Sequence, residues 1–365
     1  MRVSDSAEPR PVDGATFARL MAPFEPFETC PELGVAVSGG RDSLSLALLA
    51  HEWASARGGR ILALIVDHGL RPEAAGEALG AARLLEGLGI ESLIRRWTGA
   101  KPSGGLQQAA RAARYRLLRE ACRERGILHL LVAHHADDQA ETIAMRTARA
   151  SGPDGLAGMA AVVEWPEVRL LRPLLRMPRA RLSATLLSRG VPWIDDPSNS
   201  DPRFERARLR RDGTPAARLS GADGVRAGRE LQTAGAGVAL LEARDDGGVA
   251  IDRVLLGCLP VDLRRRLASR VVQALGGGDH PPRRERLERA LVRLCAAAAD
   301  RGRSGRGQDF TLSGCQFSLR QSAGSRELEW IVRPENGRKG RQPLIPAAFF
   351  ACYPAAATHL DRSPT

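Results

Sequence analysis

Two hydrophobic patterns alternate along the first half of the chain. Short, continuously apolar runs are typical of buried strands, and between them apolar residues recur at the three- and four-residue spacing of helices. Gly89 and Gly126 follow two of the helical segments, as caps often do. The predicted strands are residues 34–37, 61–66, 92–97 and 127–133, and the predicted helices are residues 43–50, 73–88, 107–125 and 137–149. This alternation predicts an α/β fold with a doubly wound parallel sheet.

The pattern changes near residues 211–219. From there to about residue 299 the chain is rich in Ala, Leu and Arg at helical spacing, and residues 311–332 alternate in a way that favours a hairpin. A chain of 365 residues suits two domains. We predict an N-terminal extension over 1–30, a first domain over 31–213, a smaller and mainly helical substrate-binding domain over 214–335, and a poorly ordered tail over 336–365.

A glycine-rich turn joins the first predicted strand to the first predicted helix, and we call residues 38–43 the glycine loop. Its sequence is Ser38, Gly39, Gly40, Arg41, Asp42 and Ser43. A strand, a glycine turn and a helix N-terminus together form an anion site, because the backbone approaches the ligand closely and the first helical N–H groups lack partners. An ordinary βα turn with a serine cap is the plain alternative. Asp42 would repel a bound phosphate unless a divalent cation lay between them, so the loop indicates Mg²⁺ as well.

The other polar clusters also follow predicted strands or lie on predicted helices. Asp67 and His68 end the second strand, at the sheet edge where ligands collect in open parallel sheets. Arg111 and Arg114 are three residues apart on one helix face, where they form a cationic clamp for phosphate or a solvated basic stripe. The fourth predicted strand runs into His134.

Acidic residues gather just after that strand. Asp137 and Glu141 are four residues apart, and Asp138 and Glu141 are three apart, which puts carboxylates on shared helix faces. They favour Mg²⁺ or a substrate amine over a zinc site, because two adjacent histidines on a helix do not face one ion. A helix N-terminus attracts acids for purely structural reasons as well.

Composition narrows the class of partner. The net charge of +12 favours a polyanion such as nucleic acid, although a GC-rich genome also enriches arginine. The six cysteines include no CxxC pair, which is typical of reduced thiols in a cytosolic protein. No signal peptide and no run long enough to span a membrane are visible, so we expect a cytoplasmic protein without a membrane partner.

The glycine loop resembles the PP-loop of the N-type ATP pyrophosphatases, which split ATP into AMP and pyrophosphate. Six further motifs follow in order: DHGLR, ARAARY, HHADDQAET, SGPDGLAGM, RPLL and DPSNSD. Together they resemble the tRNA(Ile)-lysidine synthetases over roughly residues 33–211. The chain has Arg149-Ala150-Ser151-Gly152 where that family commonly has Arg-Gly-Ser-Gly, and beyond residue 215 the resemblance is loose.

The resemblance implies an ATP-dependent ligase that attaches L-lysine to the 2-carbon of the wobble cytidine in the CAU anticodon of tRNA(Ile). An adenylated cytidine is the implied intermediate, and the product reads AUA in place of AUG. A PP-loop tRNA thiolase and a non-catalytic RNA-binding protein with a decayed PP-loop remain as alternatives, and a homodimer stays open.

The resemblance and the residue patterns together assign the site. The expected catalytic residues are Asp42, Arg111, Asp137, Asp138 and Glu141, with Asp42 and Asp138 holding Mg²⁺. The glycine loop, His68 and Arg114 are expected to bind ATP. The tRNA backbone needs cations, and a basic run suits that role; its members are Arg203, Arg206, Arg208, Arg210 and Arg211.

Overall fold

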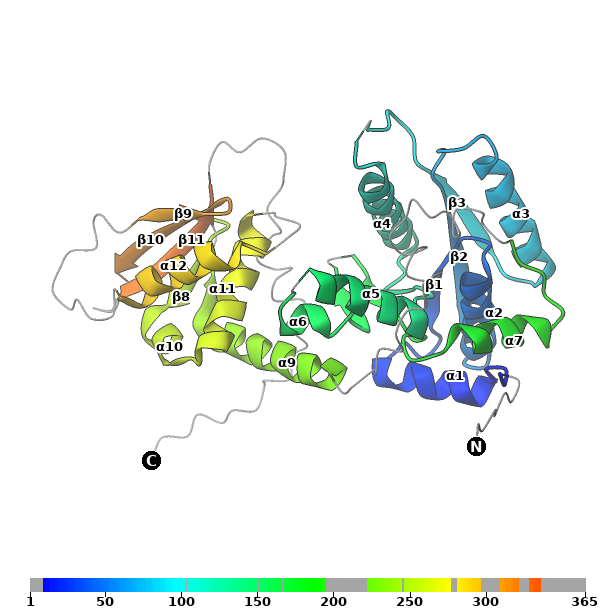
Figure 1. Cartoon of the computed structure of the whole chain (residues 1–365), viewed down its shortest axis with the longest axis horizontal. Coiled ribbons are helices and arrows are strands. Elements are labelled where there is room, and N and C mark those ends of the chain that lie inside the picture. The colour runs from blue at the N-terminus through cyan, green and yellow to red at the C-terminus, as the bar shows by residue number, and fades with distance from the viewer. Residues whose placement is uncertain are drawn as a thin grey trace. The chain divides into compact units, whose positions relative to one another are not determined.

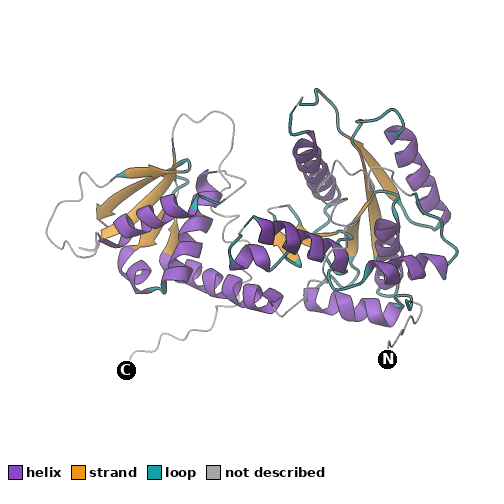
Figure 2. Cartoon of the chain, viewed as in Figure 1, coloured by secondary structure: helices purple, strands orange, loops and turns teal. Residues whose placement is uncertain are grey.

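The computed structural model describes residues 9–102, 104–149, 151–165, 167–194, 222–244, 246–276, 281–296, 309–321 and 328–335. The chain divides into two compact units, Met1–Asp223 and Gly224–Thr365, whose elements are labelled in Figure 1 and coloured by type in Figure 2. The predicted domain boundary at 213/214 and the predicted tail at 336–365 fall outside the described residues.

A six-stranded sheet forms the centre of the first unit. Its strands are β1 (Glu32–Val37), β2 (Arg60–Asp67), β3 (Ser92–Arg96), β4 (His129–Leu131), β5 (Val162–Glu164) and β6 (Arg169–Leu171). They lie in the order β3-β2-β1-β4-β6-β5. Neighbours are parallel except β5, which pairs antiparallel with β6 at one edge. The predicted doubly wound parallel sheet is therefore confirmed, and the β5–β6 hairpin extends it.

Helices cover both faces of this sheet, because each central strand is apolar on both sides. On one face Leu33, Val35 and Val37 of β1 pack with residues of α1 (Gly14–Met21), α2 (Arg41–Ser55), α3 (Ala74–Gly87) and α7 (Arg179–Leu187). On the other face Ala36 and Leu64 pack against Leu118, Ala121 and Cys122 of α4 (Leu106–Arg125). The strand order reverses between β1 and its parallel neighbour β4, which is where ligands bind in sheets of this type.

Glycine fixes the ends of α4. Gly105 precedes the helix with φ +65° and Gly126 ends it with φ +68°, a region that side chains rarely adopt. The N–H of Gly126 donates to carbonyls of the last turn, and Ile127 N donates to Cys122 O at 2.9 Å. The predicted cap at Gly126 is confirmed.

The second unit combines helices with a five-stranded antiparallel sheet. Its helices are α9 (Ala222–Leu240), α10 (Arg253–Cys258), α11 (Val261–Gly276) and α12 (Arg284–Ala296). Its strands are β7 (Leu241–Ala243), β8 (Val249–Asp252), β9 (Phe310–Leu312), β10 (Cys315–Gln321) and β11 (Leu328–Pro334), in the order β7-β8-β11-β10-β9. β10 and β11 form the predicted hairpin; the remaining strands were not expected.

One face of this second sheet is buried under the helices. Phe317, Trp330 and Val332 pack with apolar residues of α11 and α12, and Trp330 Nε1 donates to Leu294 O at 3.1 Å. The alternate positions of the same strands point to the opposite face, as the two-residue period of a strand requires.

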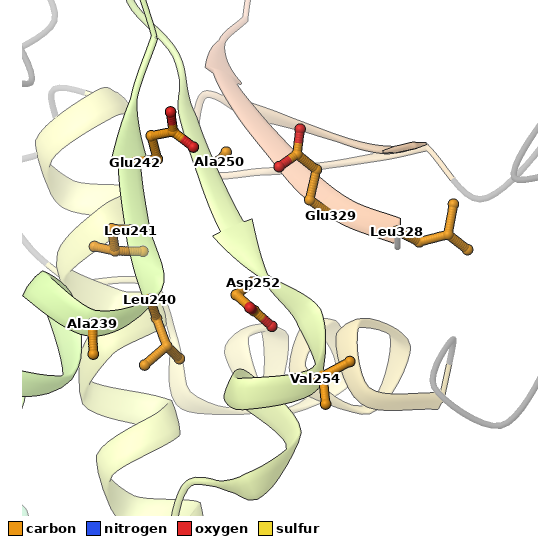
Figure 3. A pocket seen from close by; sticks show the side chains of 9 residues that line it. All are labelled: Ala239, Leu240, Leu241, Glu242, Ala250, Asp252, Val254, Leu328 and Glu329. Carbon is orange, nitrogen blue, oxygen red and sulfur yellow. The ribbon is translucent and has the colours of Figure 1, made fainter. Parts of the chain in front are cut away.

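A pocket of about 240 Å³ lies on that opposite face (Figure 3). Glu242, Asp252 and Glu329 line it, and Asp252 and Glu329 are directly paired across β8 and β11. Asp252 also caps α10 by accepting from Leu255 N at 2.9 Å. None of the predicted site residues that the structure describes lines this pocket.

Among the described residues, no helix combines the length and the hydrophobicity that crossing a membrane would require.

Candidate active site

The predicted site residues that the structure describes lie in the first unit, at the carboxyl ends of its central strands or on the helices that follow. The glycine loop follows β1, His68 follows β2, and the acidic cluster begins helix α5 (Ala136–Ala148), which follows β4. β2, β1 and β4 are neighbours in the sheet, so their carboxyl ends share one edge.

The glycine loop leaves the N-terminus of α2 open. Gly39 has φ +78°, and a Cβ there would lie 3.2 Å from both the Ala81 Cβ and the Ile194 Cδ1. Gly40 is the N-cap residue and no side chain caps the helix. The Ser43 hydroxyl instead closes the loop, accepting from Ser38 N at 3.1 Å and donating to Gly40 O at 2.9 Å. An uncapped helix start next to a tight glycine turn is an anion site.

Asp42 lies in the first turn of α2 with one oxygen available. Its Oδ2 is 3.4 Å from His135 Nε2 and 3.5 Å from Arg179 Nε. Its Oδ1 is buried and has no hydrogen-bond partner in the described part of the chain. Burial raises the pKa of Asp42, but the hydrogen bond and charge of His135 and the charges of Arg179 and Arg41 outweigh it, so the net pKa is below the usual value. The carboxylate is therefore ionised at neutral pH.

His135 is the buried centre of the acidic cluster. Its side chain is 2 % exposed, and its Nε2 lies 3.4 Å from Asp42 and 3.5 Å from Asp138, while its Nδ1 lies 3.4 Å from Asp137. Burial lowers the pKa of this imidazole, but the three carboxylates more than compensate, and the net shift is upward. His135 and Asp138 also form a reciprocal cap at the start of α5. Asp42 and Asp138, the predicted metal pair, are thus brought to one imidazole nitrogen.

The three acids of α5 have different surroundings. The Asp137 side chain is 57 % exposed, and its Oδ2 accepts from the backbone N–H of Arg179 at 2.9 Å. Asp138 and Glu141 are buried. Asp137 therefore differs in exposure from Glu141, although their spacing predicted a shared face.

Helix α5 also anchors the SGPDGLAGM segment, residues 151–159. The amide of Gln139, 1 % exposed, donates to Met159 O at 3.0 Å and accepts from Met159 N at 2.6 Å. Arg146 Nη1 donates to Gly155 O at 2.9 Å and to Gly158 O at 2.7 Å. This segment, which contains α6 (Pro153–Leu156), is thereby tied to the helix that carries the acids.

The RPLL motif joins the same group. Arg172 Nε donates to His134 Nδ1 at 3.1 Å, and Ala136 N donates to Met177 O at 3.0 Å. His134 and His135 thus contact different partners. Four of the predicted motifs, from separate parts of the chain, meet around the start of α5.

The DHGLR motif forms a turn at the end of β2. Asp67, 4 % exposed, accepts from Gly69 N at 2.8 Å through Oδ1 and from Arg96 Nε at 2.8 Å through Oδ2. His68 Nδ1 is buried without a hydrogen-bond partner among the described residues. Burial and the charge of Arg114 lower the pKa of His68. Asp67 stabilises the turn through these two hydrogen bonds, whereas His68 places a ring nitrogen there that is unbonded within the described ranges.

The arginine pair lies on α4, with unequal contacts. Arg111 stacks on Tyr115, its guanidinium carbon 5.0 Å from the ring centroid, and Arg111 Nη2 donates to the Tyr115 hydroxyl at 3.3 Å. Arg114 is half-buried and makes no ion pair within the described ranges. Burial lowers the pKa of the Arg114 guanidinium. A half-buried guanidinium without a counter-ion is suited to an anionic ligand.

Residues 179–194 complete the loop environment, and sequence reasoning did not find them. Arg179 approaches Asp42 as described above; Arg41 Nη1 donates to Ser183 Oγ at 2.9 Å and lies 5.4 Å from the Trp193 ring centroid. Ile194 N donates to Gly39 O at 3.0 Å. Pro178 before α7 is a helix-start signal that could have located this helix, but nothing local points to its role beside the loop.

The predicted RNA-contact residues lie outside the described residues. These are Arg203, Arg206, Arg208, Arg210 and Arg211, together with the DPSNSD motif.

The donor set suits a hard cation held only in part by protein. Among the residues that the structure describes, no three His, Cys, Asp or Glu side chains converge as a metal site. Asp42 nevertheless offers a buried oxygen that nothing else uses, with Asp138 near the same imidazole. Mg²⁺ is commonly bound by one or two carboxylates plus phosphate oxygens and water. The residues present therefore fit Mg²⁺ that arrives with a nucleotide.

The chain is similar to known proteins over most of its length. Residues 14–217 match the family model of a PP-loop domain. The tRNA(Ile)-lysidine synthase of a Bradyrhizobium strain is 40% identical over 348 residues, covering 88% of this chain and 96% of that protein. The enzyme of the same name from Rhodopseudomonas palustris is 41% identical, covering 90% and 96%, and that from Methylobacterium nodulans is 42% identical, covering 80% and 90%. A solved U34-tRNA thiolase from Methanococcus maripaludis is a more distant match, with 17% identity, a TM-score of 0.46, and coverage of 60% and 78%. With an open PP-loop in the structure and relatives of this identity along nearly their whole length, the chain belongs to the tRNA(Ile)-lysidine synthase family.

Proposed function

We propose that the protein is an ATP-dependent tRNA-modifying ligase that attaches L-lysine to the wobble cytidine of tRNA(Ile) with a CAU anticodon. The cytidine is first adenylated, releasing pyrophosphate, and lysine then displaces AMP. Membership of the family supports this proposal. The observation that carries it is the ionised Asp42 beside the open start of α2, with a buried oxygen unused in the described part of the chain.

The reaction needs ATP for a chemical reason. The 2-carbonyl oxygen of cytosine is a poor leaving group, so an amine cannot displace it directly. Transfer of AMP to this oxygen makes the C–O bond breakable, and the side-chain amine of lysine forms the new C–N bond as AMP departs with the oxygen. One anion site and one amine site at the same sheet edge satisfy these two steps.

The glycine loop would hold the phosphates. The first N–H groups of α2 donate to phosphate oxygens, and the loop stays open because Ser43 bonds within it. Mg²⁺, when bound by Asp42 and Asp138, would neutralise the charge of the departing pyrophosphate. His135 fixes the orientation of both carboxylates through its Nε2.

The exposed acid of α5 is the best candidate for the substrate amine. Asp137 is the one of the three α5 acids whose side chain is mostly exposed, and its position is held by the Arg179 N–H. Glu141 is buried on the same helix and would add negative charge to the amine site without direct contact. Arg111 and Arg114 would bind the phosphate groups of ATP or of the RNA.

Recognition of the tRNA fits the charge of the chain. An anticodon loop is single-stranded, so the target base can be turned into a pocket without opening a duplex. A net charge of +12 supports binding of the chain to the phosphate backbone of the tRNA. The five arginines between residues 203 and 211 remain our proposal for that contact.

Among the described residues of the first unit, no thiol at this edge suits the thiolase alternative. Cys122 packs beneath β1, and burial raises its pKa to about 12, so it is a poor nucleophile near neutral pH. A decayed, non-catalytic loop is disfavoured because Asp42 is ionised and Gly39 keeps its left-handed conformation.

Incorporation of radiolabelled lysine into an unmodified tRNA(Ile) transcript with a CAU anticodon tests the proposal. We expect ATP-dependent labelling, with none on a methionine tRNA that has the same anticodon. Asp42→Asn should lower AMP formation by about 100-fold or more, because it removes charge stabilisation at the reacting phosphates. Its affinity for tRNA should stay within about two-fold of wild type.

Glu86→Gln is the matched control, because Glu86 is an exposed acid on α3. It should retain full activity. No labelling of the tRNA by the wild-type protein would overturn the lysine assignment, and unchanged AMP formation in Asp42→Asn would overturn the metal role.

A further inference from the structure

Lys101 is an unusual residue in this chain. Of 54 Lys and Arg residues only two are lysines, Lys101 and Lys339. All the rest are arginines, and arginine is the cation in most ion pairs of the described residues. Lys101 lies in the segment between β3 and α4, at the same sheet edge as the glycine loop.

The Lys101 ammonium is held against the turn that follows β2. Trp97 N donates to Asp67 O at 2.8 Å, which fixes the start of the segment beside β2. Lys101 Nζ donates to Trp97 O at 2.6 Å and lies 3.7 Å from the centroid of the Trp97 ring. A Cβ on Gly69 would be 3.9 Å from that same carbonyl oxygen. Lys101 therefore lies next to the turn that contains His68.

Asp67, the acidic side chain that the structure describes at this turn, does not pair with Lys101 or Arg114. Within the described ranges, neither Lys101 nor Arg114 forms an ion pair. Asp67 is already occupied, one oxygen by Gly69 N and the other by Arg96 Nε. His68 Nδ1 is buried without a partner in the same part of the chain.

The charges act on one another. Burial lowers the pKa of His68, the charges of Arg114 and Lys101 lower it further, and the charge of Asp67 only partly offsets them. Both cations act on the same imidazole, and an anion that accepts from these donors would relieve the repulsion. Phosphate offers enough oxygens for three donors at once.

We propose that Lys101, His68 and Arg114 form a second phosphate subsite, separate from the glycine loop, in which Lys101 is a phosphate-binding residue. The phosphate comes from the nucleotide or from the tRNA backbone. The inference rests on the proposed function only in that ATP and tRNA are taken as the phosphate sources. Lys101 gives up one hydrogen bond to the Trp97 carbonyl or shares it, since an ammonium has three donors.

Direct binding measurements test the subsite with Lys101→Met, which keeps most of the aliphatic stem on the Trp97 ring and removes the charge. Arg123→Ala is the matched control: it also removes one cation, from an exposed position in the last turn of α4. ATP and AMP binding are measured by calorimetry, and tRNA(Ile) binding by filter retention over a range of salt. Circular dichroism and the melting temperature check folding, and Lys101→Arg serves as a second variant that keeps the charge.

If the phosphate belongs to the nucleotide, Lys101→Met should weaken ATP or AMP binding about ten-fold and leave tRNA binding unchanged. If the phosphate belongs to the tRNA, Lys101→Met should weaken tRNA binding, reduce the slope of log affinity against log salt concentration by about 1, and leave ATP binding unchanged. Lys101→Arg should restore much of either loss. The proposal is wrong if Lys101→Met matches Arg123→Ala for both ligands. Calorimetry of ATP needs no lysine transfer, so failure of the proposed reaction would not be mistaken for failure of the subsite.

Discussion

Replacement of Gly39 by alanine should destabilise the first unit and disable the glycine loop together. Gly39 has φ +78°, and its carbonyl accepts from Ile194 N at 3.0 Å. Alanine would have to adopt the left-handed conformation or lose that bond. Its Cβ would also lie 3.2 Å from the Ala81 Cβ and from the Ile194 Cδ1, closer than ordinary contact.

These two effects set the expected magnitude. The left-handed conformation costs a non-glycine residue roughly 1–2 kcal/mol. Insertion of a methyl group into a filled space costs about 1–3 kcal/mol, and the Ile194 end can move more easily than Ala81 on its helix. We therefore expect a loss of about 2–4 kcal/mol in the free energy of unfolding. Because the loop must shift to accommodate the methyl group, ATP binding should weaken as well.

Urea unfolding combined with hydrogen exchange at the β1 and α2 amides measures this loss in the first unit. Gly76→Ala is the control, because Gly76 is an exposed helical position with no atom within 4 Å of its Cβ site. That change should stabilise by about 0.5–1 kcal/mol. Ile194→Val removes the crowded Cδ1 and should recover about 0.5–1 kcal/mol in a double-mutant cycle. Wild-type stability in Gly39→Ala would refute both sources of strain.

Three further predictions concern buried groups. Gln139→Ala leaves both Met159 backbone groups without their partner, so it should cost about 2–3 kcal/mol and increase proteolysis in residues 151–159, as limited proteinase K digestion and urea melts would show; an unchanged digestion pattern would contradict the anchoring role. In the native protein at about pH 8, iodoacetamide should modify the exposed Cys30 and spare Cys122, whose pKa burial raises to about 12, and mass spectrometry of the labelled peptides decides this. Burial and the cations beside it hold the pKa of His68 below its ordinary 6.5. As the pH drops below about 6.5, the unfolded state therefore binds a proton at this residue before the folded state does, and the free energy of unfolding falls. His68→Gln should flatten that fall in urea titrations at several pH values, and an equal slope in both proteins would show that other groups cause it.

The central sheet could be predicted because its strands carry a strong local signal. Residues 61–66 are continuously apolar and form most of β2, and Gly126 ends α4 as expected. The β5–β6 hairpin was missed because each strand has three residues, too few to show a period. The second sheet was largely missed for the same reason, since β7, β8 and β9 have three or four residues each.

The candidate site divides along the same line. Glycine and acidic residues next to the predicted strand ends indicated the glycine loop and the start of α5 from the sequence alone. Arg179 could not be found this way, because its approach to Asp42 depends on how α7 packs across α2. The sequence also could not show that His135 is buried among three carboxylates. Asp137 and Asp138 are its neighbours in the chain, but Asp42 is 93 positions away.

The scarcity of lysine gives the Lys101 contact with Trp97 a practical consequence for chemical labelling. Amine-selective reagents act on lysine side chains and on the α-amino group, so within the described ranges Lys101 is the only side chain that they can modify. Coupling through amines, as in common immobilisation and biotinylation protocols, would therefore attach the protein through its α-amino group, Lys339 or Lys101, and the last of these lies at the edge of the candidate site. The same selectivity allows a footprinting experiment. The extent of Lys101 acylation would be compared with and without a ligand, and Lys339 on the same chain would serve as the internal reference.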